Sequence, residues 1–272
     1  LEIDVINRNR KAFKDADVKV AAGEYNSSYT FDNARLVDNY NSLTFNAEII
    51  FKNGNADANY GGAFFNGDKI TFVEKTSFLS NTASYGGAIY NSGDITFGGK
   101  AIFSDNTAAE NGGAIYNVGD ITFGGATTTF SENKATNLGG AIYAKEATAM
   151  SISGSSFIKN KSTSSHGGAI YAVLTPVSLS DSTFTENSSN NHAGAIGLEG
   201  STLTATGNNT FTSNTAKNHG GAVYVCKKDS TVSTVEITGG SFNNNTAMGG
   251  GAISVRTDCT ATLTNTTLNG NT

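Results

Sequence analysis

The stretch "SHGGAIYAV" (165–173) contains the pattern that decides the fold, Gly-Gly-Ala followed by a large aliphatic residue and then Tyr. Gly-Gly-Ala recurs at 61–63, 86–88, 112–114, 139–141, 167–169, 220–222 and 250–252, and Ala-Gly-Ala stands at 193–195. Successive marker alanines lie 25, 26, 27, 28, 26, 27 and 30 residues apart. A near-constant period of this length indicates a repeat architecture, in which each unit stacks on its neighbours.

Two further markers keep the same phase. Phe-x-x-Asn occurs at 78–81, 103–106, 130–133, 157–160, 184–187, 211–214 and 242–245, and a strand-forming triplet recurs, for example "ITF" at 70–72, 95–97 and 121–123. Each repeat therefore holds three short strand-like runs divided by turn residues, and no stretch in it has the length and period of a helix. The sequence predicts an all-β, right-handed parallel β-helix (a β-solenoid) of about nine coils of ~27 residues, with three short strands per coil.

The chain is expected to divide into two parts. Residues 1–40 lack the markers, and we expect them to form an N-terminal cap, because the first coil would otherwise expose an unpaired edge. Residues 41–272 are expected to form the β-helix. The chain begins at Leu1 and stops where another Gly-Gly-Ala is due, so we expect a processed piece of a longer protein whose repeats continue.

Stacked coils place equivalent residues above one another, about 4.8 Å apart. We expect the residues after each marker Ala to form an inward ladder, and the motif phenylalanines to form a second one. The Asn of Phe-x-x-Asn is expected at a strand turn, because Asn tolerates left-handed backbone angles and its amide can hydrogen-bond to the next coil. Gly-Gly is expected to allow a second bend.

Composition narrows the function. Charged residues make up 15% of the 272-residue chain and the net charge is −5, so neither a nucleic-acid surface nor an anionic-membrane surface is indicated. No apolar run approaches the ~20 residues that span a bilayer. The composition favours a mildly acidic extracytoplasmic protein, with no nucleic-acid partner and no transmembrane segment in this chain.

Alternating Gly-Gly-Ala-[Ile/Leu/Val] and Phe-x-x-Asn motifs over about residues 45–272 resemble the repeats of the polymorphic membrane protein (Pmp) family, described in chlamydial surface proteins and also found in other bacteria. The resemblance implies the β-helical passenger of an autotransporter, located at the bacterial cell surface or secreted, which acts in adhesion and has no catalytic activity. The implied partner is a host-cell surface protein or glycan. Two alternatives remain open: a carbohydrate-active β-helix enzyme, and an extracellular scaffold that self-associates through its coil ends.

The three histidines of the chain, His166, His192 and His219, each lie three residues before the marker Ala in consecutive coils. They are expected to form one outward column about 5 Å apart. Such a column suits a surface metal site or a pH-sensitive patch. Tyr60 and Tyr85 occupy the same slot, however, which favours a turn that selects flat, stacking side chains. We therefore expect no metal and no cofactor.

A second column is formed by tyrosines two residues after the marker Ala: Tyr90, Tyr116, Tyr143, Tyr171 and Tyr224. Strand alternation predicts that it points outward. It is therefore a candidate contact surface for a protein or glycan partner, although stacked aromatics also stabilise neighbouring coils.

The carboxylates and cysteines complete the candidate chemistry. Asp94 and Asp120 share a register but look like turn residues, and no Arg lies in a neighbouring register, which argues against a lyase or hydrolase site. Cys226 and Cys259 lie in adjacent coils of an exported chain, so a disulfide that clamps the last coils is a further prediction.

Overall fold

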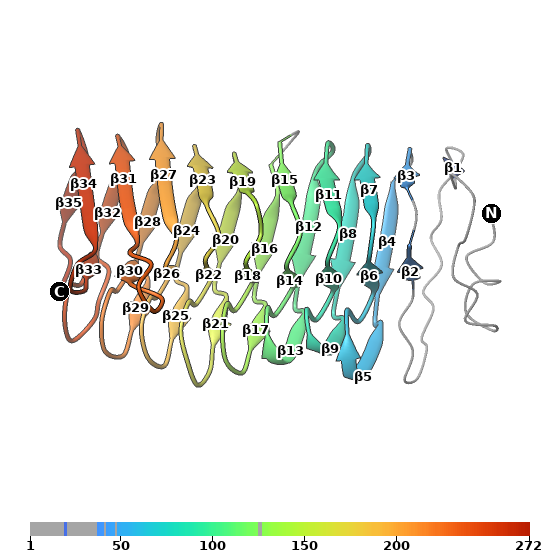
Figure 1. The fold of residues 1–272 in the computed structure, drawn as a ribbon, viewed down its shortest axis with the longest axis horizontal. Helices are drawn as coiled ribbons and strands as arrows, with labels where there is room; N and C mark the ends of the chain where they lie inside the picture. The colour runs from blue at the N-terminus through green and yellow to red at the C-terminus, as the bar shows by residue number, and fades with distance from the viewer. Residues whose placement is uncertain (1–18, 21–36, 41, 47, 125–126) are drawn as a thin grey trace.

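The computed structural model describes residues 19–20, 37–40, 42–46, 48–124 and 127–272. In this part of the chain every regular element is a strand, and all paired strands run parallel to their neighbours. The strands wind into an elongated solenoid of about eight turns, with β3 (Leu43–Phe45) near one end of the stack and β35 (Thr267–Asn269) at the other (Figure 1). The predicted parallel β-solenoid is confirmed, while its right-handed sense and the exact count of nine coils stay predictions. No helix in the described residues could cross a membrane.

Each turn contributes one strand to each of several sheets that run along the stack, and its first two strands belong to the aliphatic and triplet sheets. The aliphatic sheet carries the residues after the marker Ala and contains β2 (Val37–Asn39), β6 (Phe64–Asn66), β10 (Ile89–Asn91), β14 (Ile115–Asn117), β18 (Ile142–Lys145), β22 (Ile170–Val173), β26 (Ile196–Glu199), β30 (Val223–Cys226) and β33 (Ile253–Val255). The triplet sheet follows, with β1 (Lys19–Val20), β3 (Leu43–Phe45), β7 (Lys69–Phe72), β11 (Asp94–Phe97), β15 (Ile121–Phe123), β19 (Met150–Ser153), β23 (Val177–Ser180), β27 (Thr202–Thr206), β31 (Thr234–Thr238) and β34 (Thr260–Thr264).

Two more sheets complete the turn. The phenylalanine sheet contains β4 (Ile49–Lys52), β8 (Thr76–Leu79), β12 (Ala101–Ser104), β16 (Thr129–Ser131), β20 (Ser156–Ile158), β24 (Thr183–Thr185), β28 (Thr210–Thr212), β32 (Ser241–Asn243) and β35 (Thr267–Asn269). The short-strand sheet contains β5 (Asn55–Tyr60), β9 (Thr82–Tyr85), β13 (Thr107–Asn111), β17 (Lys134–Ala135), β21 (Lys161–Ser162), β25 (Ser188–Ser189) and β29 (Thr215–Ala216).

This short-strand sheet corrects the expectation of three strands per coil. The segment after each motif Asn is short and mostly polar, as in β21 and β25, so it shows no hydrophobic signal of a strand. It nevertheless forms a ladder, because the turn at the Asn aligns it with the same segment of the next coil. Most coils therefore have four strands.

The predicted cap lies largely outside the described residues. Its two described pieces are strands of the solenoid: β1 pairs in parallel with β3, and β2 pairs in parallel with β6. The triplet and aliphatic sheets therefore begin within residues 1–40.

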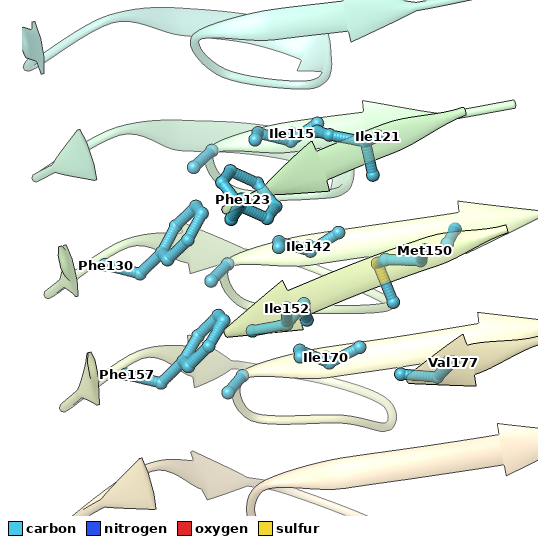
Figure 2. Close-up of a cluster of buried hydrophobic side chains, with 14 of the residues drawn as sticks. Ile115, Ile121, Phe123, Phe130, Ile142, Met150, Ile152, Phe157, Ile170 and Val177 are labelled. Carbon is cyan, nitrogen blue, oxygen red and sulfur yellow. The ribbon is translucent and has the colours of Figure 1, made fainter. Parts of the chain in front are cut away.

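The core is built from the predicted ladders. Ile115, Ile142 and Ile170 follow one another in register on the aliphatic sheet, opposite the column of Ile121, Met150 and Val177 on the triplet sheet (Figure 2). The motif phenylalanines stack face to face, with ring centroids of Phe130 and Phe157 4.7 Å apart and an interplanar angle of 3°. These side chains are fully buried, and burying each contributes about 1.5–3 kcal/mol.

The motif asparagines form a continuous buried amide ladder, as predicted. Asn133 Nδ2 donates to Asn160 Oδ1 at 2.9 Å, and Asn160 Nδ2 donates to Asn187 Oδ1 at 2.9 Å. The left-handed backbone was wrongly expected at the Asn itself; it belongs to the preceding residue, for example Lys159 with φ 55°. The exposed preceding residue makes the bend, which leaves the buried Asn free to bond along the stack.

Candidate functional site

The outer face of the aliphatic sheet carries the two predicted columns. Strand pairing places Phe65, Tyr90, Tyr116, Tyr143, Tyr171, Gly197, Tyr224 and Ser254 in one register, which we call the tyrosine column. The three histidines form the histidine column, in which His192 and His219 are bridged in parallel. The tyrosine column lies outside the main core: Tyr143 and Tyr171 belong to a separate hydrophobic cluster, and Tyr116 packs against that cluster.

The tyrosine column is stacked, but much of it is not exposed. Tyr90 and Tyr116 stack with centroids 4.9 Å apart and are half-buried. Tyr143, Tyr171 and Tyr224 are only 6%, 2% and 8% exposed. The expected exposed aromatic stripe is therefore wrong for these three residues. Leu138 and Leu174 pack against the cluster that Tyr143 and Tyr171 form with Val173, and the His192 ring stacks on Tyr224.

The histidine rings stack on one another and on the tyrosines. The His166–His192 and His192–His219 centroids are 4.9 and 5.0 Å apart, and Tyr224 stacks on His192 at 4.5 Å. The backbone N–H of His192 donates to Nδ1 of His166 at 3.3 Å, so that nitrogen is an acceptor. Burial, followed by the charges of His166, His219 and Arg256, lowers the pKa of His192 from 6.5 to about 4. Burial also lowers the pKa of His166, although Glu199 opposes this effect.

Stacking explains the position of the histidines without a metal. Face-to-face imidazoles direct their nitrogens along parallel planes instead of toward one point, whereas a zinc site needs converging ligands. Within the described residues, no group of three or more His, Cys, Asp or Glu side chains is placed to hold a metal ion.

The tyrosine column is interrupted at Gly197, and the same coil departs from the repeat at a second position, Ala193. The first Gly of the Gly-Gly pair has a positive φ, and a β-carbon on Gly167 would lie 2.8 Å from Cβ of Tyr171. In the next coil this position is Ala193, with φ 62°. Its methyl group fits because the residue four positions later is Gly197, which has no side chain. Ala193 and Gly197 therefore form a compensating pair.

A cleft of about 580 Å³ lies beside this part of the column and is lined by Tyr171 and Tyr224, the two residues paired with Gly197; we call it the Gly197 cleft. The aliphatic strands contribute Tyr171, Glu199, Tyr224 and Cys226 to its lining, and the segments that precede these strands contribute Asn111, Asn137, Leu138, Ser165, His166 and His192. The Tyr171 ring lies directly beside Gly197, as shown by the distance of only 2.4 Å between a β-carbon built on Gly197 and Cδ2 of Tyr171.

Glu199 contacts side chains from both neighbouring coils at this cleft. Its Oε2 accepts a hydrogen bond from the Tyr171 hydroxyl at 3.0 Å, and its Oε1 lies 3.1 Å from Nζ of Lys228. Burial, followed by the Glu199 charge, raises the pKa of the Tyr171 hydroxyl and raises that of the Cys226 thiol to about 11. Both groups are therefore protonated at neutral pH.

Both cysteines are free thiols in the structure, and the disulfide between Cys226 and Cys259 stays a prediction. Cys226 ends β30 and faces the cleft, whereas Cys259 packs against the main core.

Three features of the aliphatic strands and the turns beside them were missed by sequence reasoning. The first is Glu199, whose only sequence signal is a charge in a register that holds Val173 in the preceding coil. The second is the Ala193–Gly197 pair, visible as a double departure from Gly-Gly-Ala-Ile-Tyr. The third is an inner amide ladder in which Asn66 donates to Asn91 and Asn91 to Asn117, both at 2.7 Å.

The predicted repeats are found by comparison with known families. The model of the Chlamydia polymorphic membrane protein repeat matches residues 75–92, 100–118, 127–145, 154–173, 210–226 and 239–256. These six segments run from the phenylalanine strand of one coil to the aliphatic strand that follows. No curated protein and no solved structure matches the chain. The coil with the Ala193–Gly197 pair lies outside the six matched segments.

Proposed function

Because the chain carries six polymorphic membrane protein repeats, we propose that it is an extracellular, passenger-like segment of a bacterial surface protein that acts in adhesion to host cells. The observation that carries this proposal is the match of the repeats together with the solenoid they build. A stack of near-identical turns makes a long, regular body in which each turn contacts only its neighbours. Such a body can hold a binding surface away from the cell that bears it.

We propose a binding role without catalysis. Hydrolysis of a glycosidic bond ordinarily uses a pair of carboxyl groups that flank the scissile bond. The Gly197 cleft has one carboxylate among its lining residues, Glu199, and that group is already engaged by Tyr171 and Lys228. Asp94 is the first residue of β11, and Asp120 directly precedes β15, where its Oδ1 accepts a hydrogen bond from the backbone N–H of Ala149. These placements support binding over hydrolysis.

Saturable binding to cultured epithelial cells tests the adhesive role. The fluorescently labelled 272-residue chain is added over a concentration series, with excess unlabelled chain as competitor. We expect binding that saturates and that the unlabelled chain displaces. A heat-denatured sample provides the matched control for non-specific adsorption. Binding that rises linearly and is not displaced would show that this segment is a spacer and that adhesion is not its function.

A further inference from the structure

The Gly197 cleft lies beside the one position of the described tyrosine column at which a residue without a ring is paired with a tyrosine on both sides. Elsewhere in this register a tyrosine or phenylalanine stands at the equivalent position, except at Asp38 in β2 and at Ser254 near the last turn. Residue 197 has no ring, and Ala193, four positions earlier, stands where the other coils have the first glycine of the Gly-Gly pair. The lining residues come from five consecutive turns, which span about 19 Å at ~4.8 Å per turn. A volume of about 580 Å³ is within the ~300–1,000 Å³ range of small-molecule sites.

The charge balance of the cleft selects the class of ligand. Glu199 is neutralised by Lys228. The low pKa of His166 and His192 keeps both rings uncharged at pH 7, and the high pKa of Cys226 keeps its sulfur as a thiol. Arg256 is exposed and does not line the cleft. An anionic ligand therefore meets no free cation there, and a cationic ligand would have to displace Lys228.

Hydrogen-bonding groups are nevertheless available along the cleft. Asn111 uses its Oδ1 to accept from the backbone N–H of Leu138 at 3.0 Å. Within the residues that the structure describes, its amide Nδ2 and the Ser165 hydroxyl have no hydrogen-bond partner. Leu138 and the aromatic rings add apolar patches between these polar groups. The cleft is therefore polar, uncharged and partly apolar.

We propose that the Gly197 cleft binds a neutral oligosaccharide of a few hexose units, which lies along the solenoid axis between the histidine and tyrosine columns. A neutral sugar presents many hydroxyl groups and an apolar C–H face, and both kinds of group are matched here without any need for charge. The ligand bridges several turns, so recognition depends on the stack and not on a single coil. This assignment rests on the proposed adhesive function and names its partner as the glycan part of the host surface.

The test uses the full 272-residue chain and oligosaccharides of defined charge. Cellotetraose, chitotetraose and lacto-N-tetraose are the neutral probes, a heparin-derived tetrasaccharide is anionic, and a glucosamine tetramer is cationic. Saturation-transfer NMR detects binding, and calorimetry at pH 7.4 measures affinity. We expect saturable binding of at least one neutral probe and weaker binding of both charged probes. If a charged probe binds more tightly than every neutral probe, or if no neutral probe binds at millimolar concentration, the proposal is wrong.

A matched set of variants locates the binding. The double variant Ala193→Gly/Gly197→Tyr restores the residues found in the other coils and fills the cleft, while Ala193→Gly alone leaves it open. We expect the double variant to lose oligosaccharide binding and the single variant to keep it.

A second variant keeps the test decisive if the double variant does not fold. Asn111→Asp preserves the oxygen that accepts from Leu138 but removes the amide donor and adds a charge. We expect oligosaccharide affinity at least tenfold weaker than that of the parent. Unchanged affinity in Asn111→Asp, or in a folded double variant, would overturn the assignment.

The same variants separate this assignment from the adhesive role. If the double variant still binds cells saturably, adhesion stands and the cleft is not its site, which points to a protein partner on another face. If the parent binds oligosaccharide but not cells, the cleft is a sugar site and adhesion is wrong.

Discussion

At the scale of single residues, the two glycines of the Gly-Gly pair are required for different reasons. The first, Gly167, has a φ of 70°, a conformation that costs an L-residue about 1–2 kcal/mol. A β-carbon there would also lie 2.5 Å from the carbonyl oxygen of Ile170. The second, Gly168, has a negative φ, but its β-carbon would lie 2.1 Å from the carbonyl oxygen of Gly194 in the next coil. The first glycine permits the bend, and the second permits the coils to approach.

We expect Gly167→Ala to lower the free energy of unfolding by about 2–3 kcal/mol, since backbone strain adds to the contact with Ile170 and Tyr171. Ala193→Gly is the matched control at the equivalent position. It relieves a strained φ but removes a buried methyl group, so we expect a change within about 1 kcal/mol. Urea denaturation followed by circular dichroism measures both. Equal effects of the two variants would refute the role given to the Ala193–Gly197 pair.

At the scale of secondary-structure elements, the buried amides connect successive coils in addition to the backbone hydrogen bonds and the apolar packing. Asn160 accepts from both the backbone N–H and Nδ2 of Asn133, at 3.1 and 2.9 Å. Its own Nδ2 donates to the Phe130 carbonyl and to Asn187. One side chain therefore satisfies buried groups in three successive coils.

We expect Asn160→Ala to lower the free energy of unfolding by about 3 kcal/mol or more, because several buried polar groups lose their partner at about 1–3 kcal/mol each. Asn208, whose side chain is exposed, provides the control: Asn208→Ala should stay within about 0.5 kcal/mol of the parent. Chemical denaturation of the three proteins decides the point. A loss below 1 kcal/mol for Asn160→Ala would show that water or a shifted neighbour replaces the amide.

The histidine column predicts loss of stability in acid. The pKa of His192 is lowered on folding, so the unfolded chain binds more protons once the pH falls below about 6.5. Stability from this group is therefore complete above pH 6.5 and declines as the pH falls toward 4. We expect His192→Asn, which introduces the residue of the same slot at Asn111, to be less sensitive between pH 6.5 and 5. Thermal melts across this range measure the slope, and identical slopes for parent and variant would contradict the prediction.

The sequence was sufficient to predict the ladders but not the layer outside them. The register of Ile142 on Ile170, and of Phe130 on Phe157, follows from a period that any stacked coil must respect. The burial of Tyr143 and Tyr171 does not follow from it, because alternation tells which side of a strand a residue faces but not what covers that side. Glu199 was unpredictable for a related reason. Its partners Tyr171 and Lys228 lie in two other coils and have no repeated spacing to reveal them.

At the scale of the whole molecule, stability is distributed along the axis. Every sheet extends through the stack by pairing the same element of successive coils, as in the order β14, β18, β22. No described sheet joins distant coils, so the unit of the structure is the complete turn. Ile115, Ile142 and Ile170 occupy one register, which means that removal of a whole turn brings equivalent residues together again.

We therefore expect deletion of residues 142–169, one complete turn, to give a folded protein. Ala141 then precedes Ile170 as Ala169 does in the parent, Phe130 stacks on Phe184, and Asn133 meets Asn187. Deletion of residues 142–155 removes about half a turn and is the matched control. It places the phenylalanine strand β20 where an aliphatic strand belongs, so that residues of different ladders would face one another in successive coils. Circular dichroism should show native β structure only for the whole-turn deletion, and small-angle scattering should show a particle shorter by about 4.8 Å. Equal folding of both deletions would mean that register does not hold the solenoid together, whereas failure of the whole-turn deletion would mean that contacts beyond nearest neighbours do.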